Sequence, residues 1–160
     1  MNGESFRLAR GLALATPLFL LGGAYVAQYG FGLPPCEMCW WQRYPQFAAL
    51  ALAALAFVAP GRTPQRLLVM LAAIAIAVSG LIGAFHAGVE YGWWQGLTAC
   101  SSTTLASGGD PLASIWATPI VRCDVAPWSL MGVSLAGWNF LFSTAAALCI
   151  LLLLRRRGRA

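Results

Sequence analysis

Residues 67–89 read LLVMLAAIAIAVSGLIGAFHAGV and contain no Asp, Glu, Lys or Arg. An α-helix rises about 1.5 Å per residue, so about 20 apolar residues cross the roughly 30 Å hydrocarbon core of a bilayer. Lipid offers no hydrogen-bond partners, so the peptide groups of such a segment must pair with one another. The stretch therefore predicts a transmembrane α-helix.

The same pattern recurs at residues 11–29, 40–59 and 130–154. The chain has 160 residues, of which 59% are hydrophobic and 9% charged, and its mean hydropathy is +0.71. This composition excludes an ordinary soluble domain. We expect an all-α fold without a sheet, in which residues 1–160 form one integral membrane domain built as a four-helix bundle.

The arginines predict how the bundle is oriented. Basic residues collect at the cytoplasmic ends and loops of membrane proteins. Eight of the ten basic residues fall on one predicted side: Arg7, Arg10, Arg62, Arg66, Arg155, Arg156, Arg157 and Arg159. We expect a multi-pass membrane protein with both termini cytoplasmic and outer loops at about 30–39 and 90–129, which are periplasmic loops if the membrane is a bacterial inner membrane. The net charge of +5 then reflects topology and lipid contact rather than nucleic-acid binding.

The first apolar run has a second interpretation. Arg7 and Arg10 ahead of an apolar stretch also describe a secretory signal peptide. The run is long for a signal sequence and three further runs follow it. We therefore expect an uncleaved membrane anchor.

Four cysteines, at positions 36, 39, 100 and 123, fall on the predicted outer face. The bacterial periplasm is an oxidising compartment in which thiols form disulfides. Four cysteines allow three pairings, and proximity in sequence favours Cys36 with Cys39 and Cys100 with Cys123. Cys149 lies inside the fourth apolar run, and we expect a small buried packing residue there.

The CxxC pair at Cys36 and Cys39 suggests redox chemistry rather than a structural staple. A disulfide that closes so short a loop gives little entropic stabilisation, whereas the spacing suits thiol–disulfide exchange. If the segment is helical, Arg43 shares a face with Cys39 and favours its thiolate. Pro45 instead suggests a helix that begins near Gln42, with Cys39 just outside it. Alternatively, Arg43 is a plain membrane anchor that reaches the lipid headgroups.

Near the outer end of the third run, His86 and Glu90 are separated by one helical turn. Ionisable residues within a membrane segment are candidates for function, although a purely structural pair remains the alternative. We expect Trp93, Trp94, Trp128 and Trp138 to serve the aromatic belt and packing, and Asn139 to bridge helices. Ser79 with Gly83, and Gly132 with Ala136, have the spacing of close helix contacts.

The second outer loop holds a short apolar face at Leu112, Ile115, Trp116 and Ile120. Its helical spacing predicts a short interfacial helix lying in the headgroup plane, with a surface turn as the alternative. Residues 107–110 precede it and read as a flexible hinge.

Three stretches resemble one known family. PPCEMCWWQRYP (34–45) is similar to the CxxCxxQRxP signature of the bacterial disulfide-bond formation protein B (DsbB) family of thiol:quinone oxidoreductases. FHAGVEYGWWQG (85–96) resembles that family's third-helix ending, and CDVAPWSLMGVSLAGWN (123–139) its entry into the fourth helix. The likeness covers nearly the whole chain.

The resemblance implies an electron relay. A periplasmic thioredoxin-like dithiol protein of the DsbA type attacks the loop disulfide at Cys100, which releases Cys123. Exchange then reduces the Cys36–Cys39 pair, and Cys39 passes the electrons to a membrane quinone, either ubiquinone or menaquinone. In this resemblance Arg43 sits at the quinone head, and Gln42, His86 and Glu90 are further candidates for the quinone site. We expect a monomer that holds no metal.

Other functions are compatible with parts of the pattern. A vitamin K epoxide reductase-like enzyme also uses four helices, but its quinone-side CxxC comes after the loop cysteines. A metal-binding membrane protein would use the CxxC with His86, although a second CxxC is missing. In a structural protein with two inert disulfides, the cysteines would never be reduced during turnover.

Overall fold

The computed structural model describes residues 3–97 and 121–155. Its elements are α1 (Gly3–Tyr25), the π-helical turn η1 (Val26–Gly30), α2 (Glu37–Val58), α3 (Arg62–Glu90), β1 (Ser129–Leu130), β2 (Val133–Ser134) and α5 (Leu135–Arg155). Cys100, the hinge at 107–110, the interfacial helix at 112–120 and the arginines at 156–159 lie outside the described residues.

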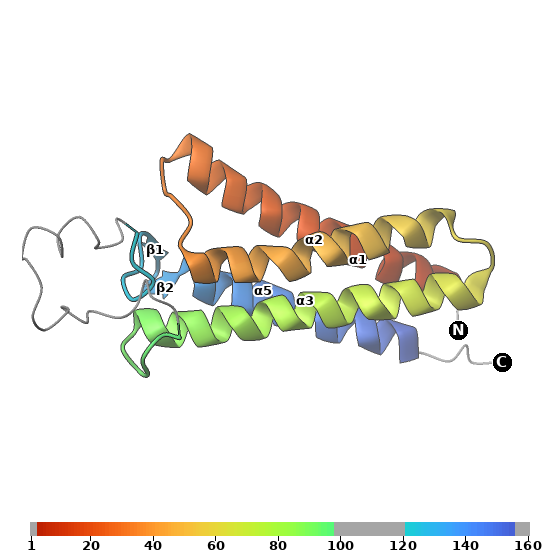
Figure 1. Ribbon diagram of the computed structural model, residues 1–160. Helices are drawn as coiled ribbons and strands as arrows, with labels where there is room; N and C mark the ends of the chain where they lie inside the picture. The colour runs from red at the N-terminus through yellow and green to blue at the C-terminus, as the bar shows by residue number, and fades with distance from the viewer. Residues whose placement is uncertain (1–2, 98–120, 156–160) are drawn as a thin grey trace, which may run out of the picture.

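The four α-helices of the described residues run side by side, with the start of α1 and the end of α5 at one end and the hairpin β1–β2 at the other (Figure 1). Helix α3 packs most extensively, against α2 and α5, and α1 packs on α2 and α5. The stretches Gly3–Gly30, Arg62–Glu90 and Leu135–Arg155 are long and apolar enough to cross a membrane. The all-helical membrane bundle is therefore confirmed in its main features.

Helix α2 does not meet that apolar criterion, although a span was predicted there. Its first half carries Gln42, Arg43 and Gln46, and all three are buried in the bundle. With 22 residues it is about 33 Å long, comparable to the hydrocarbon core. Its polar residues thus face other helices, while its second half is apolar.

The core between the helices is built largely from alanine. Its buried residues are Phe6, Ala9, Ala13, Ala49, Ala53, Ala56, Val69, Ala72, Ala73, Ile76, Ala147, Ile150 and Leu154. In a membrane, lipid tails solvate large apolar side chains as well as the protein does, so helices associate through close packing of small residues. The larger residues accordingly point outward, as Phe19 and Leu81 do, each 66% exposed.

Of the two alternatives for the start of α2, the structure supports a helix that includes both Cys39 and Arg43, and the start near Gln42 is wrong. The helix starts at Glu37 and includes Cys39, because Cys36 caps it: the Cys39 amide donates to Cys36 Sγ over 3.3 Å. Pro45 lies inside the helix. It removes one backbone donor, but proline is tolerated in membrane helices where neighbouring helices satisfy the freed groups. The Cys36 cap therefore determines where the helix begins, and Pro45 does not.

In contrast to α2, the fourth helix begins later than expected, at Leu135, and the prediction of no sheet is wrong. Residues 129–134 form a two-stranded antiparallel hairpin ahead of α5. Met131 and Gly132 at its tip both have positive φ, 53° and 78°, as a type I′ turn requires. The Tyr91 hydroxyl at the end of α3 donates to the Gly132 carbonyl and accepts from the Ser134 amide, which ties the hairpin to the bundle.

The predicted close helix contact at Gly83 of α3 is confirmed, and the one predicted at Gly132 is wrong. A Cβ on Gly83 would lie 2.9 Å from the Ala136 carbonyl oxygen and 3.1 Å from both Asn139 Nδ2 and Gln42 Oε1. Gly83 therefore allows α3 to approach α2 and α5 closely. Gly132 belongs to the hairpin turn instead.

Cys149 lies within α5 and is exposed on its outer surface rather than buried between the helices. Apart from Arg43 of α2, the arginines of the described helices lie towards the start of α1, at the start of α3 or at the end of α5, and these three helix ends lie at one end of the bundle (Figure 1). There Arg66 donates to the Leu154 carbonyl, and Gly3 lies next to Arg62. Cys36, at the start of α2, belongs to the opposite end.

Replacing Gly83 with alanine is expected to destabilise the bundle by about 1–3 kcal/mol, because the new methyl group overpacks the contact of α3 with α5. Gly22→Ala in α1 is the matched control, since a Cβ there meets nothing within 4 Å. Thermal unfolding in lipid or detergent measures the difference. Equal melting temperatures for the two variants would contradict the close approach.

Candidate redox site

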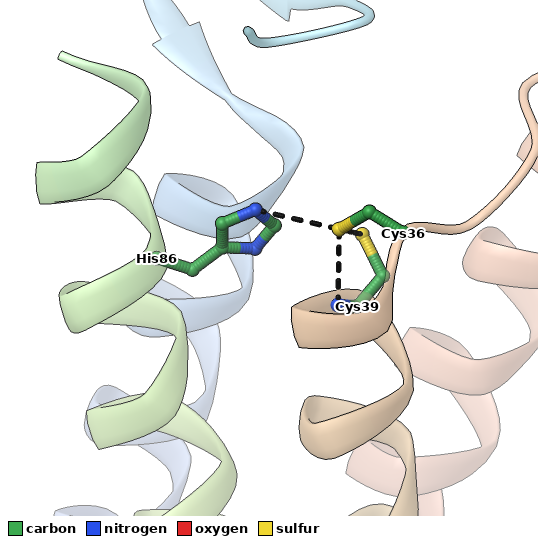
Figure 2. A group of neighbouring side chains, drawn as sticks. All are labelled: Cys36, Cys39 and His86. Carbon is green, nitrogen blue, oxygen red and sulfur yellow. Dashed lines mark hydrogen bonds between the residues drawn. The ribbon is translucent and has the colours of Figure 1, made fainter. Parts of the chain in front are cut away.

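Cys36 and Cys39 lie at the beginning of α2, facing His86 of α3 (Figure 2). Pro34 and Pro35 precede Cys36, whose extended backbone (φ −75°, ψ 175°) turns the chain into the helix. The Cys36 thiol donates to Cys39 Sγ over 3.0 Å. The two sulfurs are therefore placed for one to carry the proton and the other the negative charge.

The pKa of Cys36 is raised to about 12. The main cause is the hydrogen bond to Cys39, which holds the thiol proton, and burial adds to it. His86 acts in the opposite direction, because its ring lies 3.5 Å from the sulfur. At neutral pH Cys36 is thus the protonated partner of the pair, and Cys39 Sγ accepts its hydrogen bond.

His86 and Glu90 face the cysteines from the end of α3. The side chains of both are only 2% exposed, and His86 Nε2 lies 3.8 Å from Glu90 Oε1. The second carboxylate oxygen, Oε2, is buried without a hydrogen-bond partner among the described residues. The structure therefore brings His86 to the CxxC pair and keeps Glu90 directly behind it.

Gln42 connects this group to a polar network inside the bundle. Its amide nitrogen lies 2.8 Å from His86 Nδ1 and donates to the Met38 carbonyl over 3.2 Å. Its amide oxygen accepts from Asn139 Nδ2 over 2.8 Å, and Asn139 also donates to Ser79. Asn139 thus bridges α5 to α2 and α3, as the sequence predicted.

Arg43 is buried, at 7% exposed, between α2 and the end of α1. Its guanidinium donates to Gln28 Oε1 over 2.6 Å and to the Ala24 carbonyl over 3.2 Å. It also lies 5.0 Å from the ring centroids of Tyr25 and Trp40. This is not the extended placement of an arginine that reaches for lipid headgroups.

Two cavities meet at Cys39. The first, of about 240 Å³, lies between α1, α2 and α5 and is lined mainly by apolar residues, with Arg43 and Gln42 among them. The second, of about 270 Å³, is lined by His86, Glu90 and residues of the segment 121–127. Cys39 lines both, whereas Cys36 lines only the second. Cys39, together with Pro34 and Pro127, thus lies between a bundle-side cavity and a loop-side cavity.

Cys123 enters the site from the second loop. It is 1% exposed and packs in one buried cluster with Cys36, Met38 and Val89, and its backbone adjoins the His86 ring. Next to it, the Arg122 guanidinium lowers the pKa of Asp124 through their ion pair. The structure therefore brings together three of the four predicted redox cysteines; Cys100 lies outside the described residues.

Two further groups on the bundle-side cavity escaped the sequence analysis. Trp138 stacks on Phe142, as expected of a packing residue, and its buried indole Nε1 has no hydrogen-bond partner among the described residues. Gln46 lines the same cavity, and its Oε1 lacks a partner in the described part of the chain. Gln46 follows Gln42 by one helical turn, which is the one sequence signal that could have pointed to it.

The sequence model of the family "Disulfide bond formation protein DsbB" matches residues 6–153. The chain belongs to the DsbB family. It is 30% identical to Disulfide bond formation protein B of Verminephrobacter eiseniae over 92% of this chain and 85% of that protein. The homologue of Aromatoleum aromaticum is 32% identical, with 87% of each chain covered. Disulfide bond formation protein B 1 of Pseudomonas putida is 31% identical, covering 89% and 87%. No solved structure matches the chain.

Membership of the DsbB family confirms the resemblance drawn from the three sequence stretches. It also assigns the chain to disulfide formation, and it disfavours a vitamin K epoxide reductase-like enzyme or a structural membrane protein. The matched region contains the CxxC pair, His86 and both cysteines of the second loop.

Removing the acceptor of the Cys36 thiol should make Cys36 more reactive. In the reduced protein, Cys39→Ala is expected to lower the pKa of Cys36 from about 12 and to raise its alkylation rate at pH 8 at least about tenfold, because thiolate abundance changes tenfold per pKa unit. Iodoacetamide labelling followed by peptide mass spectrometry measures the rate. Cys149→Ala should leave the Cys36 rate unchanged. Equal Cys36 rates with and without Cys39 would contradict the hydrogen-bonded pair.

Proposed function

We propose that this DsbB-family chain is an inner-membrane thiol:quinone oxidoreductase that reoxidises a periplasmic DsbA-type dithiol protein. One observation carries the proposal: Cys39 is the cysteine that lines both the loop-side cavity and the apolar bundle-side cavity among the described residues. A protein donor dissolves in water and a quinone dissolves in lipid. A sulfur that borders both cavities can accept electrons from one side and release them on the other.

The bundle-side cavity fits a quinone head group. Its walls are largely apolar, from residues such as Phe19, Leu21 and Phe142. Quinone carbonyls need hydrogen-bond donors, and the cavity offers the Arg43 guanidinium and the indole Nε1 of Trp138, which has no partner among residues 3–97 and 121–155. When bound, a quinone supplies a lipid-soluble acceptor of two electrons and two protons. Both ubiquinone and menaquinone satisfy this chemistry.

The loop cysteines take the first step of the proposed relay. The donor dithiol reduces the Cys100–Cys123 disulfide and leaves as a disulfide, so two electrons and two protons enter the chain. Cys123 then attacks the Cys36–Cys39 disulfide. Its burial in one cluster with Cys36 supports this exchange. The loop pair returns to a disulfide while Cys36 and Cys39 become a dithiol.

The CxxC pair takes the second step. Cys39 holds the negative charge because Cys36 keeps its proton, and Arg43 one turn later adds a fixed positive charge at the same cavity. Two electrons and two protons leave the pair, and the Cys36–Cys39 disulfide forms again. The net reaction converts one dithiol and one quinone into one disulfide and one quinol.

Burial limits where the protons of this reaction can travel. His86 and Glu90 line the loop-side cavity, which also includes Arg122 of the second loop. We assign them to proton supply and to orientation of the Cys36 sulfur.

The cytoplasmic placement of both termini follows from the arginines at that end of the bundle and from the periplasmic location that the thiol chemistry requires.

Turnover tests the proposal. Purified protein in lipid should reduce a quinone in a one-to-one ratio with oxidation of a DsbA-type dithiol protein, measured by quinone absorbance and thiol titration. Cys39→Ser should reduce quinone turnover to background and still trap the donor as a mixed disulfide at Cys100. Cys149→Ala, on the outer surface of α5, should turn over like the parent. Full quinone turnover by the Cys39 variant would overturn the relay.

Arg43 should contribute mainly to quinone affinity. Arg43→Ala is expected to raise the apparent KM for quinone about 10- to 100-fold, because a hydrogen bond from a charged donor contributes about 1.5–3 kcal/mol. Steady-state kinetics across quinone concentrations measure this. Arg43→Lys keeps the charge and should lose less, and Arg66→Ala at the other end of the bundle is the control. An unchanged KM in Arg43→Ala would reassign Arg43 to packing.

A further inference from the structure

The redox site has the composition of a metal site. Cys36, Cys39 and His86 each present a ligand atom, and these atoms lie within 4.8 Å of one another. Glu90 Oε1 lies next to this group, 3.8 Å from His86 Nε2, but is not one of the three mutually close ligand atoms. Thiolates, imidazole and carboxylate are the ligands that zinc prefers. A redox enzyme whose reduced pair captured zinc would be blocked, so the site needs a feature that prevents it.

The hydrogen bonds of Gln42 determine which nitrogen of His86 carries the proton. Carbonyl oxygens only accept hydrogen bonds, so the Gln42 amide nitrogen must be the atom that faces the Met38 carbonyl at 3.2 Å. The same nitrogen faces His86 Nδ1 at 2.8 Å. An NH₂ group only donates, and Nδ1 must therefore accept with a lone pair. The neutral imidazole then carries its proton on Nε2.

Asn139 prevents the Gln42 amide from turning round. Its nitrogen is fixed by the Ser79 carbonyl, at 3.2 Å, and donates to Gln42 Oε1 at 2.8 Å. Its oxygen accepts from the Ser143 hydroxyl at 3.0 Å. A reversed Gln42 would set NH₂ against NH₂ and carbonyl against carbonyl. Two backbone carbonyls, on α2 and α3, thus fix the orientation of both amides.

We propose that Gln42 is a positioning residue that holds His86 as the Nε2–H tautomer, which makes the ring a hydrogen-bond donor to Cys36 and denies its lone pair to thiophilic metals. Nε2–H points at Cys36 Sγ, 3.5 Å away, and towards the Glu90 carboxylate. The donors then run in one direction, from Gln42 through His86 and Cys36 to Cys39. The chain ends on the sulfur that borders the bundle-side cavity.

Gln42→Glu should reverse the arrangement. A carboxylate has nearly the shape of the amide but only accepts hydrogen bonds, so it favours a proton on His86 Nδ1 and frees Nε2. Metal-bound histidines commonly donate their other N–H to such a carboxylate. The substitution would therefore change a hydrogen-bond donor chain into a metal site without altering the three ligands.

The chain contains one histidine, so its tautomer can be read from a single pair of resonances. We expect ¹⁵N-histidine NMR of the reduced full-length protein in lipid to show an unprotonated Nδ1 and a protonated Nε2. Gln42→Glu should move the proton to Nδ1 or protonate both nitrogens. A proton on Nδ1 in the parent protein, whether in the neutral Nδ1–H tautomer or in a ring protonated on both nitrogens, would overturn the proposal.

Gln28→Glu is the matched control for this measurement. It also replaces an amide by a carboxylate, but Gln28 accepts a hydrogen bond from Arg43 rather than contacting His86. The His86 resonances of this variant should match those of the parent. If Gln28→Glu shifted the tautomer as Gln42→Glu does, a general effect of charge would replace the specific role of Gln42.

Cobalt(II) binding provides the second test, because its absorbance reports thiolate and imidazole ligation. His86→Ala should leave the Co²⁺ affinity of the reduced parent protein unchanged within about twofold. The same change in the Gln42→Glu background should weaken binding at least about tenfold, the lower end of known losses at metal sites. Each background is compared with its own His86→Ala variant, so that Co²⁺ binding by the other cysteines, which is the same in both, cancels. A tenfold loss in the parent background would show His86 to be a ligand and overturn the proposal.

The use of this tautomer in electron transfer depends on the proposed function, but both tests are independent of it. Neither NMR nor Co²⁺ titration needs a quinone or a dithiol donor. A protein that shows the expected tautomer yet reduces no quinone would refute the relay alone.

Discussion

The hydrogen bond from Asn139 to Gln42 is the interaction on which the arrangement of the site depends. It joins α5 to α2 in a part of the bundle where the buried polar groups lie among helices rather than in water. Where water is excluded, each polar group needs a partner in the protein, and an incomplete network costs more than an apolar core. Ser79 adds α3 by donating to the Gln42 carbonyl and accepting from Asn139. The relative position of three helices is thereby fixed next to the sulfurs.

Small side chains make this network possible. Gly83 lets Asn139 and Gln42 meet over α3, and the alanine core keeps the helices close along the rest of their length. Apolar packing in a membrane is not strongly directional, since lipid competes for the same surfaces. Hydrogen bonds supply the direction. The close packing therefore sets the distance between helices, and the amides set which side chains face each other.

Much of the fold could be predicted from the sequence because the lipid environment demands long apolar helices and sorts arginines to one end. The ends of the helices were less predictable. Pro45 suggested a helix start that the Cys36 cap overrides, and residues 130–134 are apolar enough to extend a span but form a hairpin. At the site, the motif identified Cys36, Cys39 and His86. The orphaned atoms of Trp138 and Gln46 depend on packing between helices, which spacing along one chain does not reveal.

Residue identity alone leaves two chemistries open at this site, since two cysteines, a histidine and a glutamate can either hold zinc or exchange electrons. The difference lies in the position of one proton. A histidine that accepts at Nδ1 from an amide donates from Nε2, and a donor polarises a thiol pair without ligating a metal. The amide that makes this choice, Gln42, is held by Asn139 and not by the redox residues. The polar network in the bundle therefore acts on the chemistry at its edge, and a substitution far from the sulfurs in sequence can alter their reactivity by releasing one amide.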